Sequence, residues 1–291
     1  MVEVSAGRLD RRLALKVQTL CPFSALNTVW RNLDVGHKTL DLEITNLNIG
    51  GELMIEYELN KLTNGLSTIS VIICTLNEAE NLPHVLPKIP NWVGEVILVD
   101  GHSTDNTVEV ARKLSSDIKV LYQPGKGKGD ALKCGIENAT GDIIVTLDAD
   151  GATPPEEMSK FIEPLLNGYD FTKGSRFAVG LPQGKPWYRI LGNWIITLTF
   201  NLLFFRRYTD LCSGYNAFWK KAIERVNLNS VDGFENEPLI NARSAKAKLK
   251  VTEIGYREGA RIGGEIKEKS WRQGPKAIKT ILRERFCRLR T

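Results

Sequence analysis

Residues 143–150 read IIVTLDAD, a nearly continuous apolar run that ends in two aspartates separated by one residue. A run of this kind is typical of a strand buried on both faces, as in a parallel sheet covered by helices. We therefore predict a central strand over 143–148, with the carboxylates of Asp148 and Asp150 at its carboxyl end. Acidic pairs at strand ends are common, so this pair alone is weak support for a function.

Similar apolar runs precede this strand at 69–75, 95–100 and 118–122. The stretches between the runs predict helices at 78–86, 107–114, 130–138 and 154–166, the last with Thr153 as N-cap and Pro154 at its first position. Strands that alternate with helices indicate an α/β fold with a mostly parallel central sheet flanked by helices. In such sheets, ligands bind beyond the carboxyl ends of the strands.

The composition argues against several classes of protein. The 291 residues include five scattered cysteines, without a CxxC pair, and three histidines, a pattern that favours reduced thiols over a disulfide framework or a zinc cluster. The net charge of +5 is mild and lies mostly toward the C-terminus, and we expect no nucleic-acid partner. The N-terminal residues do not read as a signal peptide, so we expect a cytoplasmic protein.

We expect three parts along the chain. Residues 1–66 show no steady periodicity and are interpreted as an N-terminal extension of unclear structure, whereas residues 67–265 carry the α/β pattern. Residues 266–291 are rich in Lys and Arg, with apolar residues at helical spacing, and predict a basic amphipathic helix. A further apolar segment at 190–205 is too short to cross a bilayer unaided.

Polar residues also stand at the ends of the first two predicted strands. Thr75, Asn77 and Glu78 end or follow the first strand, and Asp100 ends the second. Because parallel strands end at the same edge of a sheet, we expect these residues to share one pocket with Asp148 and Asp150. Carboxylates suit a hard divalent cation such as Mg²⁺ or Mn²⁺, which neutralises a diphosphate.

A glycine-rich loop, GKGKG at 125–129, precedes the third predicted helix. Its glycines permit close approach of the backbone to a ligand, and Lys126 and Lys128, on either side of Gly127, can offset phosphate charge. The spacing matches neither a Walker A motif nor a dinucleotide fingerprint. A plain glycine-rich turn is the alternative.

Six motifs in order resemble the GT-A fold of family 2 glycosyltransferases, and among them the polyprenyl-phosphate sugar synthases of the dolichol-phosphate mannose and glucose types. The resemblance covers about residues 67–264. The motifs are VIICTLNEAENL, VDGHSTDNT, GKGKGDALKCGI, LDADGATPPE, KGSRF and DLCSGYNAF. We therefore expect a Rossmann-like nucleotide-diphospho-sugar transferase that moves a hexose.

The resemblance implies roles for the residues at matching positions. Thr75, Asn77, Glu78 and Asp100 would line the nucleoside pocket, and Asp148 and Asp150 would bind the diphosphate of a UDP- or GDP-sugar through Mg²⁺ or Mn²⁺. Lys126, Gly127 and Lys128 would lie near the nucleotide. Arg176 would meet phosphate oxygens, and Ser213 would lie near the acceptor phosphate and the sugar.

The sequence also departs from the family pattern. Cys74, Leu76 and Gly101 replace the usual proline, aromatic residue and second aspartate, which leaves the base of the donor open. Ala152 stands where related synthases have a metal-binding glutamine. Thr209 stands where they have an arginine for the lipid phosphate, a place that Arg206 or Arg207 can fill.

For the acceptor, we expect a polyprenyl phosphate at a membrane surface, reached by peripheral attachment through the 190–205 segment and the C-terminal helix. Inverting transfer to a phosphate oxygen needs no protein base. The alternative is a hydroxyl acceptor, with Glu235 or Glu237, or else Asp210, as the base. A nucleotidyltransferase and a non-catalytic binding protein are further alternatives, and the oligomeric state stays open.

Overall fold

The computed structural model describes residues 68–181, 185–226, 228, 236–264 and 270–286, together with four short strands near the N-terminus. The chain divides into two units, Met1–Leu66 and Ser67–Thr291. In the first unit, β1 (Val2–Val4) pairs antiparallel with β2 (Leu40–Leu42), and β3 (Asn46–Ile49) pairs antiparallel with β4 (Glu52–Ile55).

The second unit is built on a seven-stranded sheet with the order β11-β9-β10-β8-β5-β6-β7. The pairs β5–β6, β5–β8, β6–β7 and β9–β11 are parallel, and β10 runs antiparallel to both β8 and β9. The strands are β5 (Ile69–Thr75), β6 (Glu95–Asp100), β7 (Lys119–Tyr122), β8 (Ile143–Asp148), β9 (Phe171–Ser175), β10 (Asn216–Trp219) and β11 (Val251–Gly255). The mostly parallel α/β sheet predicted from the sequence is therefore confirmed.

The register of the central strands positions the site. Cys74 of β5 pairs with Asp148 of β8, and Thr75 pairs with Asp100 of β6. The three strands therefore end at one level, and the polar residues at their ends lie side by side. Of the four strands predicted, three have the predicted bounds, and β7 begins one residue later, at Lys119.

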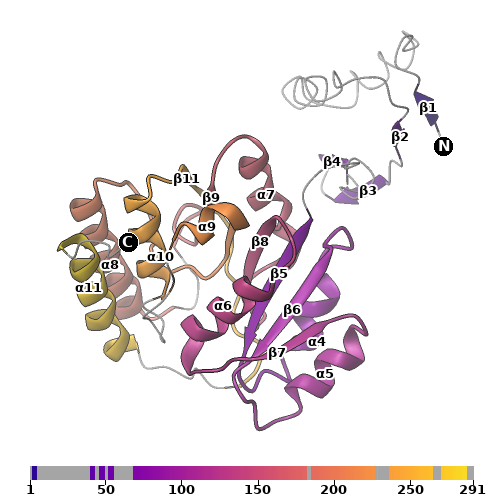
Figure 1. Cartoon of the computed structure of the whole chain (residues 1–291), viewed down its shortest axis with the longest axis horizontal. Helices are drawn as coiled ribbons and strands as arrows, with labels where there is room; N and C mark the ends of the chain where they lie inside the picture. Colours follow the sequence, from indigo (N-terminus) through magenta and orange to yellow (C-terminus); the bar gives the residue numbers. More distant parts are fainter. Residues whose placement is uncertain are drawn as a thin grey trace. The chain divides into compact units, whose positions relative to one another are not determined.

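Helices lie against the sheet and also beyond one end of it (Figure 1). They are α4 (Leu82–Val85), η1 (Leu86–Lys88), α5 (Thr107–Leu114), α6 (Gly127–Asn138), η2 (Pro155–Glu157), α7 (Ser159–Leu166), α8 (Trp187–Phe204), α9 (Lys220–Glu224), α10 (Asn236–Lys246) and α11 (Ser270–Phe286). Figure 1 shows α8, α10 and α11 grouped together, and β7 lies at the sheet edge opposite β11. In the described residues, no helix is both long and apolar enough to span a membrane.

Three predicted helix starts are wrong, and that of α6, at Gly127 instead of residue 130, is described with the site. The predicted helix at 154–166 is replaced by η2 and α7, and Pro154 is extended (φ −77°, ψ 106°). Pro155 follows it, and a residue before proline is disfavoured in the helical region, so Thr153 caps no helix. The predicted helix at 78–86 begins only at Leu82, because the backbone of Glu78 and Asn81 forms a turn first.

The core forms between α6 and the strands beneath it, with Ile72, Ile97, Val99, Leu132 and Ile136 all buried. A second cluster joins Ile196 and Phe200 of α8 to Ala242 of α10 and Ile281 of α11. Polar contacts also join α10 and α11: Glu284 of α11 accepts a hydrogen bond from Arg243 at 2.9 Å and from Lys246 at 3.2 Å. The C-terminal helix is thus packed on the α/β unit along one face.

Two helical glycines allow a matched test of this packing. A Cβ on Gly135 of α6 would lie 2.6 Å from Cγ2 of Ile72, whereas a Cβ on Gly192 of α8 meets nothing within 4 Å. We predict that Gly135→Ala lowers the free energy of unfolding by about 1–3 kcal/mol, because the core must move apart. Gly192→Ala should raise it by about 0.5–1 kcal/mol through helix propensity. Urea unfolding measures both, and equal effects of the two changes would contradict the packing described.

Candidate functional site

The ends of β5 and β6 are tied together by buried polar contacts. The hydroxyl of Thr75 donates to Oδ1 of Asp100 at 3.2 Å. The other carboxylate oxygen of Asp100 accepts from the backbone N–H of Ser103 at 2.8 Å, so this aspartate holds the turn that follows β6. Asp100 is 1% exposed. The predicted proximity of Thr75 and Asp100 is therefore present in the structure.

The loop after β5 is fixed to the same turn. Asn77 adopts a left-handed conformation (φ 51°), and its side-chain oxygen accepts from the backbone N–H of Thr104 at 2.7 Å. The backbone N–H of Glu78 donates to the hydroxyl of Thr107 at 2.8 Å. The four residues expected to line a nucleoside pocket thus belong to one hydrogen-bonded rim.

Arg261 joins this rim to the aspartate pair. Its guanidinium lies 2.6 Å from Oε2 of Glu78 and 3.8 Å from Oδ2 of Asp150. The backbone N–H of Ile262 donates to the carbonyl of Asp150 at 3.1 Å. Gly151 has a φ of +77°, and a Cβ there would lie 2.4 Å from Ile262, so the turn needs glycine. The loop after β11 therefore lies against Asp150.

Arg261 was not among the predicted site residues. The contact of Arg261 with Glu78 links positions 183 residues apart. Two adjacent glycines, Gly263 and Gly264, were the local signal, because they mark a loop that approaches other backbone closely.

Asp148 is bound by a lysine from the glycine-rich loop. Nζ of Lys128, in the first turn of α6, lies 2.7 Å from Oδ1 of Asp148 and 3.0 Å from Oε1 of Glu237. Burial disfavours the ammonium, but Asp148 and Glu237 outweigh it and raise the pKa of Lys128 well above its ordinary value. Lys128, which was expected near the nucleotide, thus lies beside Asp148 and also contacts Glu237.

The two aspartates differ in charge environment. Burial opposes the charge of Asp148, yet Lys128, with support from Arg176 and Lys185, brings the pKa of Asp148 below its ordinary value. Burial and the neighbouring Asp148 instead raise the pKa of Asp150. Two carboxylates that perturb each other in this way are a favourable place for added positive charge.

This pair fits a divalent cation with a diphosphate. The side chains of Asp148 and Asp150 are 35% and 30% exposed, so solvent and ligands reach both. In the part of the chain that the structure describes, no group of three or more His, Cys, Asp or Glu residues is arranged to bind a metal. Mg²⁺ commonly binds to one or two carboxylates and takes its other ligands from water and substrate phosphates.

Lys126 and Gly127 come directly before Lys128, where the glycine-rich loop passes into α6. Lys126 is exposed and precedes α6, and Gly127 has a φ of +83°, which favours glycine. Asp130 accepts from the backbone N–H of Gly125 at 2.7 Å and closes the loop. Helix α6 therefore starts three residues before the predicted position, and the loop is short and anchored.

Arg176 is bound by a buried carboxylate. Its Nε and Nη2 lie 2.6 Å and 2.9 Å from the two carboxylate oxygens of Asp210, and a third contact joins it to Glu258 at 3.6 Å. Asp210 also accepts from the side-chain amide of Asn193 at 2.8 Å. The predicted contact of Arg176 with phosphate oxygens is not tested by this geometry, in which both arms of its fork bind Asp210.

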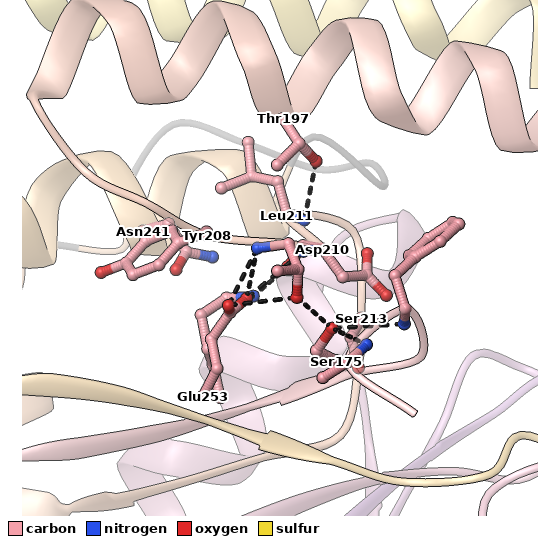
Figure 2. A network of polar contacts seen from close by, with 12 residues as sticks. Ser175, Thr197, Tyr208, Asp210, Leu211, Ser213, Asn241 and Glu253 are labelled. Atoms are coloured by element: carbon pink, nitrogen blue, oxygen red, sulfur yellow. Dashed lines mark hydrogen bonds and ion pairs between the residues drawn. The ribbon is translucent and has the colours of Figure 1, made fainter. Parts of the chain in front are cut away.

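The residues around Asp210 form a polar network beneath α8 (Figure 2). Glu253 accepts from the backbone N–H groups of Thr209 and Asp210 at 2.8 Å and 3.3 Å, and Nζ of the buried Lys173 lies 3.2 Å from it. Figure 2 shows Ser213 beside Ser175 at the edge of this network. Thr209, where an arginine was expected for the acceptor, is thus part of the scaffold.

Ser213 is a buried residue of the same region. It is 1% exposed, and its hydroxyl lies 3.0 Å from the hydroxyl of Tyr256. A Cβ on Gly174 of β9 would lie 2.9 Å from this hydroxyl, so Ser213 is tightly packed. In this conformation it supports the loop that leads to Gly214 and does not face a surface.

The candidate bases for a hydroxyl acceptor fare differently. Glu235 lies outside the described residues. Glu237 is 5% exposed, and burial raises its pKa although Lys128 opposes the rise. Burial opposes the charge of Asp210, but Arg176 outweighs it and holds the pKa of Asp210 well below its ordinary value, so this carboxylate is a poor proton acceptor.

The Arg176–Asp210 pair gives a prediction on stability and pH. Asp210→Asn leaves a buried guanidinium without its carboxylate, and we predict a loss of about 3–5 kcal/mol in the free energy of unfolding at pH 7. Because the folded-state pKa of Asp210 is depressed, its contribution is complete above the ordinary pKa of about 4 and is lost as the pH falls further.

The wild type should therefore lose more stability than Asp210→Asn between pH 5 and pH 3, as urea unfolding at each pH measures. The exposed Asp117 offers the control, since Asp117→Asn should change stability by less than about 0.5 kcal/mol. Parallel pH profiles for the wild type and Asp210→Asn would contradict the assignment.

Comparisons with known proteins agree with this geometry. The family model "Glycosyl transferase family 2" matches residues 70–226. A dolichol-phosphate mannosyltransferase of Pyrococcus furiosus is 37% identical over 213 residues, which are 69% of this chain and 59% of that relative. A polyprenol monophosphomannose synthase of Mycolicibacterium smegmatis is 30% identical over 56% of this chain and 65% of its own length. The chain thus spans less than two thirds of either relative.

A glucosyl-3-phosphoglycerate synthase of Mycobacterium tuberculosis, solved with Mn²⁺, UDP and glucosyl-3-phosphoglycerate, has the same fold. The two structures superpose with a TM-score of 0.63 at 21% sequence identity, over 84% of this chain and 88% of that one. The GT-A fold expected from the motifs is confirmed. The chain belongs to glycosyl transferase family 2.

Proposed function

We propose that this glycosyltransferase moves a sugar from a UDP- or GDP-sugar to a polyprenyl phosphate at a membrane surface, with inversion at the anomeric carbon. The observation that carries the proposal is the meeting of Asp148 and Asp150 with the polar ends of β5 and β6. The names of relatives add support, because they include a dolichol-phosphate mannosyltransferase and an undecaprenyl-phosphate 4-deoxy-4-formamido-L-arabinose transferase.

In this proposal, Asp148 and Asp150 bind Mg²⁺ or Mn²⁺, and the metal supplies positive charge to the departing diphosphate. Structural neighbours were solved with UDP and either Mn²⁺ or Mg²⁺. The hydrogen-bonded rim of Thr75, Asn77, Glu78 and Asp100 holds the nucleoside. Lys128, from the loop of Lys126 and Gly127, offsets diphosphate charge.

In this proposal, Arg176, Asp210 and Ser213 act indirectly, by positioning other residues of the site. Arg176 and Asp210 fix the end of β9 and contribute positive potential near Asp148, whose pKa Arg176 helps to lower. Ser213, through Tyr256, holds the turn that brings Gly214 against Asp148. We propose that Arg176 and Ser213 position the site, and that Arg176 meets an acceptor phosphate only if its contact with Asp210 rearranges.

A phosphate acceptor needs no protein base. An oxygen of the acceptor phosphate forms the new bond to the anomeric carbon while the bond from that carbon to the diphosphate breaks, and its electron pair stays with the diphosphate. The acceptor oxygen is already anionic at neutral pH, so the enzyme has mainly to position both substrates and stabilise charge. The raised pKa of Glu237 is the one observation that favours a hydroxyl acceptor.

Helix α8 provides the surface for the membrane. Trp187, Leu191, Trp194, Leu198 and Leu202 recur at helical spacing, and Trp187, Trp194 and Leu202 are 73%, 61% and 68% exposed. A groove of about 720 Å³ lies between α8 and α11, and its lining includes the apolar Ile195, Ile278 and Leu282 and the basic Lys279 and Arg283. An apolar stripe beside basic residues fits peripheral attachment at the cytoplasmic face of a membrane.

A transfer assay tests the proposed reaction. Incubation with labelled UDP- and GDP-sugars, Mn²⁺ or Mg²⁺ and undecaprenyl phosphate should move label into an organic extract. Asp150→Asn should lower this rate by about 100-fold or more, because the metal that stabilises the diphosphate loses a carboxylate ligand. The control Asp117→Asn changes an exposed aspartate and should keep the rate. Label that passes only to a hydroxyl acceptor would favour the alternative reaction.

The proposed membrane contact through α8 predicts weaker vesicle binding when its exposed apolar residues become charged. Trp194→Glu and Leu202→Glu should each weaken binding to phosphatidylglycerol vesicles by about tenfold or more, since burial of one large apolar side chain is worth about 1.5–3 kcal/mol. Leu114→Glu on α5 is the control, because Leu114 is 40% exposed but lies outside α8 and α11. Co-sedimentation measures the binding. Equal binding by all three variants would refute a membrane contact through α8.

A further inference from the structure

Lys128 bridges two buried carboxylates, one of which is a proposed metal ligand. We propose that Lys128 is a built-in counter-cation that keeps a divalent metal off Asp148 until a diphosphate draws the ammonium away, so that metal and donor bind together. The inference rests on the proposed metal-dependent transfer and assigns to Lys128 and Glu237 the control of metal loading.

The bridge is formed by distant parts of the chain. Lys128 comes from α6, Asp148 from the end of β8 and Glu237 from the first turn of α10. Nζ of Lys128 lies 2.7 Å from Asp148 and 3.0 Å from Glu237, and the side chains of Lys128 and Glu237 are only 19% and 6% exposed. The lysine is thus a fixed part of the site and not a solvated surface charge.

Gly214 closes the bridge from one side. A Cβ at Gly214 would lie 2.6 Å from Nζ of Lys128 and 2.7 Å from Oδ2 of Asp148. A larger residue would push the ammonium and the carboxylate apart, so this position requires glycine for steric reasons. The close cover explains how the serine–glycine pair at 213–214 serves the site although Ser213 itself is buried.

The ammonium of Lys128 and a divalent cation compete for Asp148. One ammonium between two carboxylates leaves one negative charge, so a divalent cation that reaches Asp148 also meets the ammonium a few ångströms away. Repulsion between charges at such distances is large in a partly buried site. A diphosphate reverses the balance, because it attracts both the metal and the ammonium of Lys128.

The structure gives Lys128 a place to remain. A small cavity of about 10 Å³ adjoins the bridge and is lined by Lys128, Asp148, Glu237, Asn216 and Asn236, among others. Among the described residues, the side-chain oxygen of Asn216 and the side-chain nitrogen of Asn236 have no hydrogen-bond partner. The side-chain oxygen of Asn216 is thus an acceptor to which the ammonium can turn when it releases Asp148, while its contact with Glu237 persists.

The consequence is a coupling between metal and nucleotide. If Lys128 opposes the metal and favours the diphosphate, then each ligand raises the affinity for the other by the same factor. Phosphate oxygens that bind the metal directly also contribute to this factor. The part due to Lys128 is the part that disappears when its charge is removed.

The test measures Mn²⁺ affinity by electron paramagnetic resonance of free Mn²⁺, without nucleotide and with UDP or GDP. Lys128→Gln should bind Mn²⁺ alone at least tenfold more tightly than the wild type, and the gain in affinity on adding nucleotide should shrink by at least tenfold. Lys133→Gln removes the same charge from a more exposed position of α6, where the lysine pairs with Glu137, and should leave both values within about twofold.

Glu237→Gln provides an independent variant with the opposite sign. It leaves Lys128 to Asp148 alone, so Mn²⁺ without nucleotide should bind more weakly than to the wild type. The double change Lys128→Gln with Glu237→Gln preserves the net charge but removes the bridge, and should still bind Mn²⁺ alone more tightly than the wild type. A return to the wild-type value would overturn the role of the Lys128–Asp148 contact.

The outcomes separate the inference from the proposed function. If the wild type binds Mn²⁺ with neither UDP nor GDP, metal-dependent transfer fails and the inference fails with it. If the wild type binds Mn²⁺ with nucleotide but Lys128→Gln binds Mn²⁺ alone no more tightly, only the inference fails. Should Lys128→Gln not fold, as its melting curve would show, the Glu237→Gln result decides.

Discussion

The register between β5, β6 and β8 is the constraint on which the site depends. It sets Cys74 opposite Asp148 and Thr75 opposite Asp100, so β6 and β8 deliver carboxylates to one edge of the sheet, on either side of the end of β5. Carboxylates at such close quarters repel one another and are stable only with positive charge or hydrogen-bond donors nearby. The protein supplies Lys128 to Asp148, Arg261 to Glu78 and Asp150, and Ser103 to Asp100. Each partner belongs to a loop or helix start, which explains why the loops around the site are so firmly tied.

A second charge pair supports the site from behind. Arg176 and Asp210 join the end of β9 to the segment before β10, and Lys173 and Glu253 extend the contact to β11. This network carries the turn at 213–214 toward Asp148 and supports α8 through Asn193. The same buried ion pairs therefore connect the sugar-nucleotide edge of the sheet to the helix proposed to meet the membrane. The proposed donor and acceptor regions are thus joined by one network of ion pairs and hydrogen bonds.

The sequence predicted those features that depend on neighbouring residues. Apolar runs located β5, β6 and β8 because strands buried on both faces need such runs, and residues at their ends then fell together by the geometry of a parallel sheet. It did not predict contacts between distant positions, such as Arg261 with Glu78 or Lys128 with Glu237, since no local pattern specifies which charge will meet which. The start of α7 was missed because the effect of Pro155 on Pro154 outweighed the capping preference of Thr153. Ser213 matched a motif, but only its burial showed that it supports the site from within.

The central claim is that Asp148 and Asp150 together bind a divalent cation that also binds the donor diphosphate. A crystal structure of the protein with Mn²⁺ and UDP or GDP, with anomalous scattering used to locate the metal, tests it most directly. The account predicts one strong anomalous peak within about 2.0–2.3 Å of oxygens from both carboxylates and from the diphosphate. A nucleotide bound at the ends of β5 and β6 without any peak between the two aspartates would contradict it.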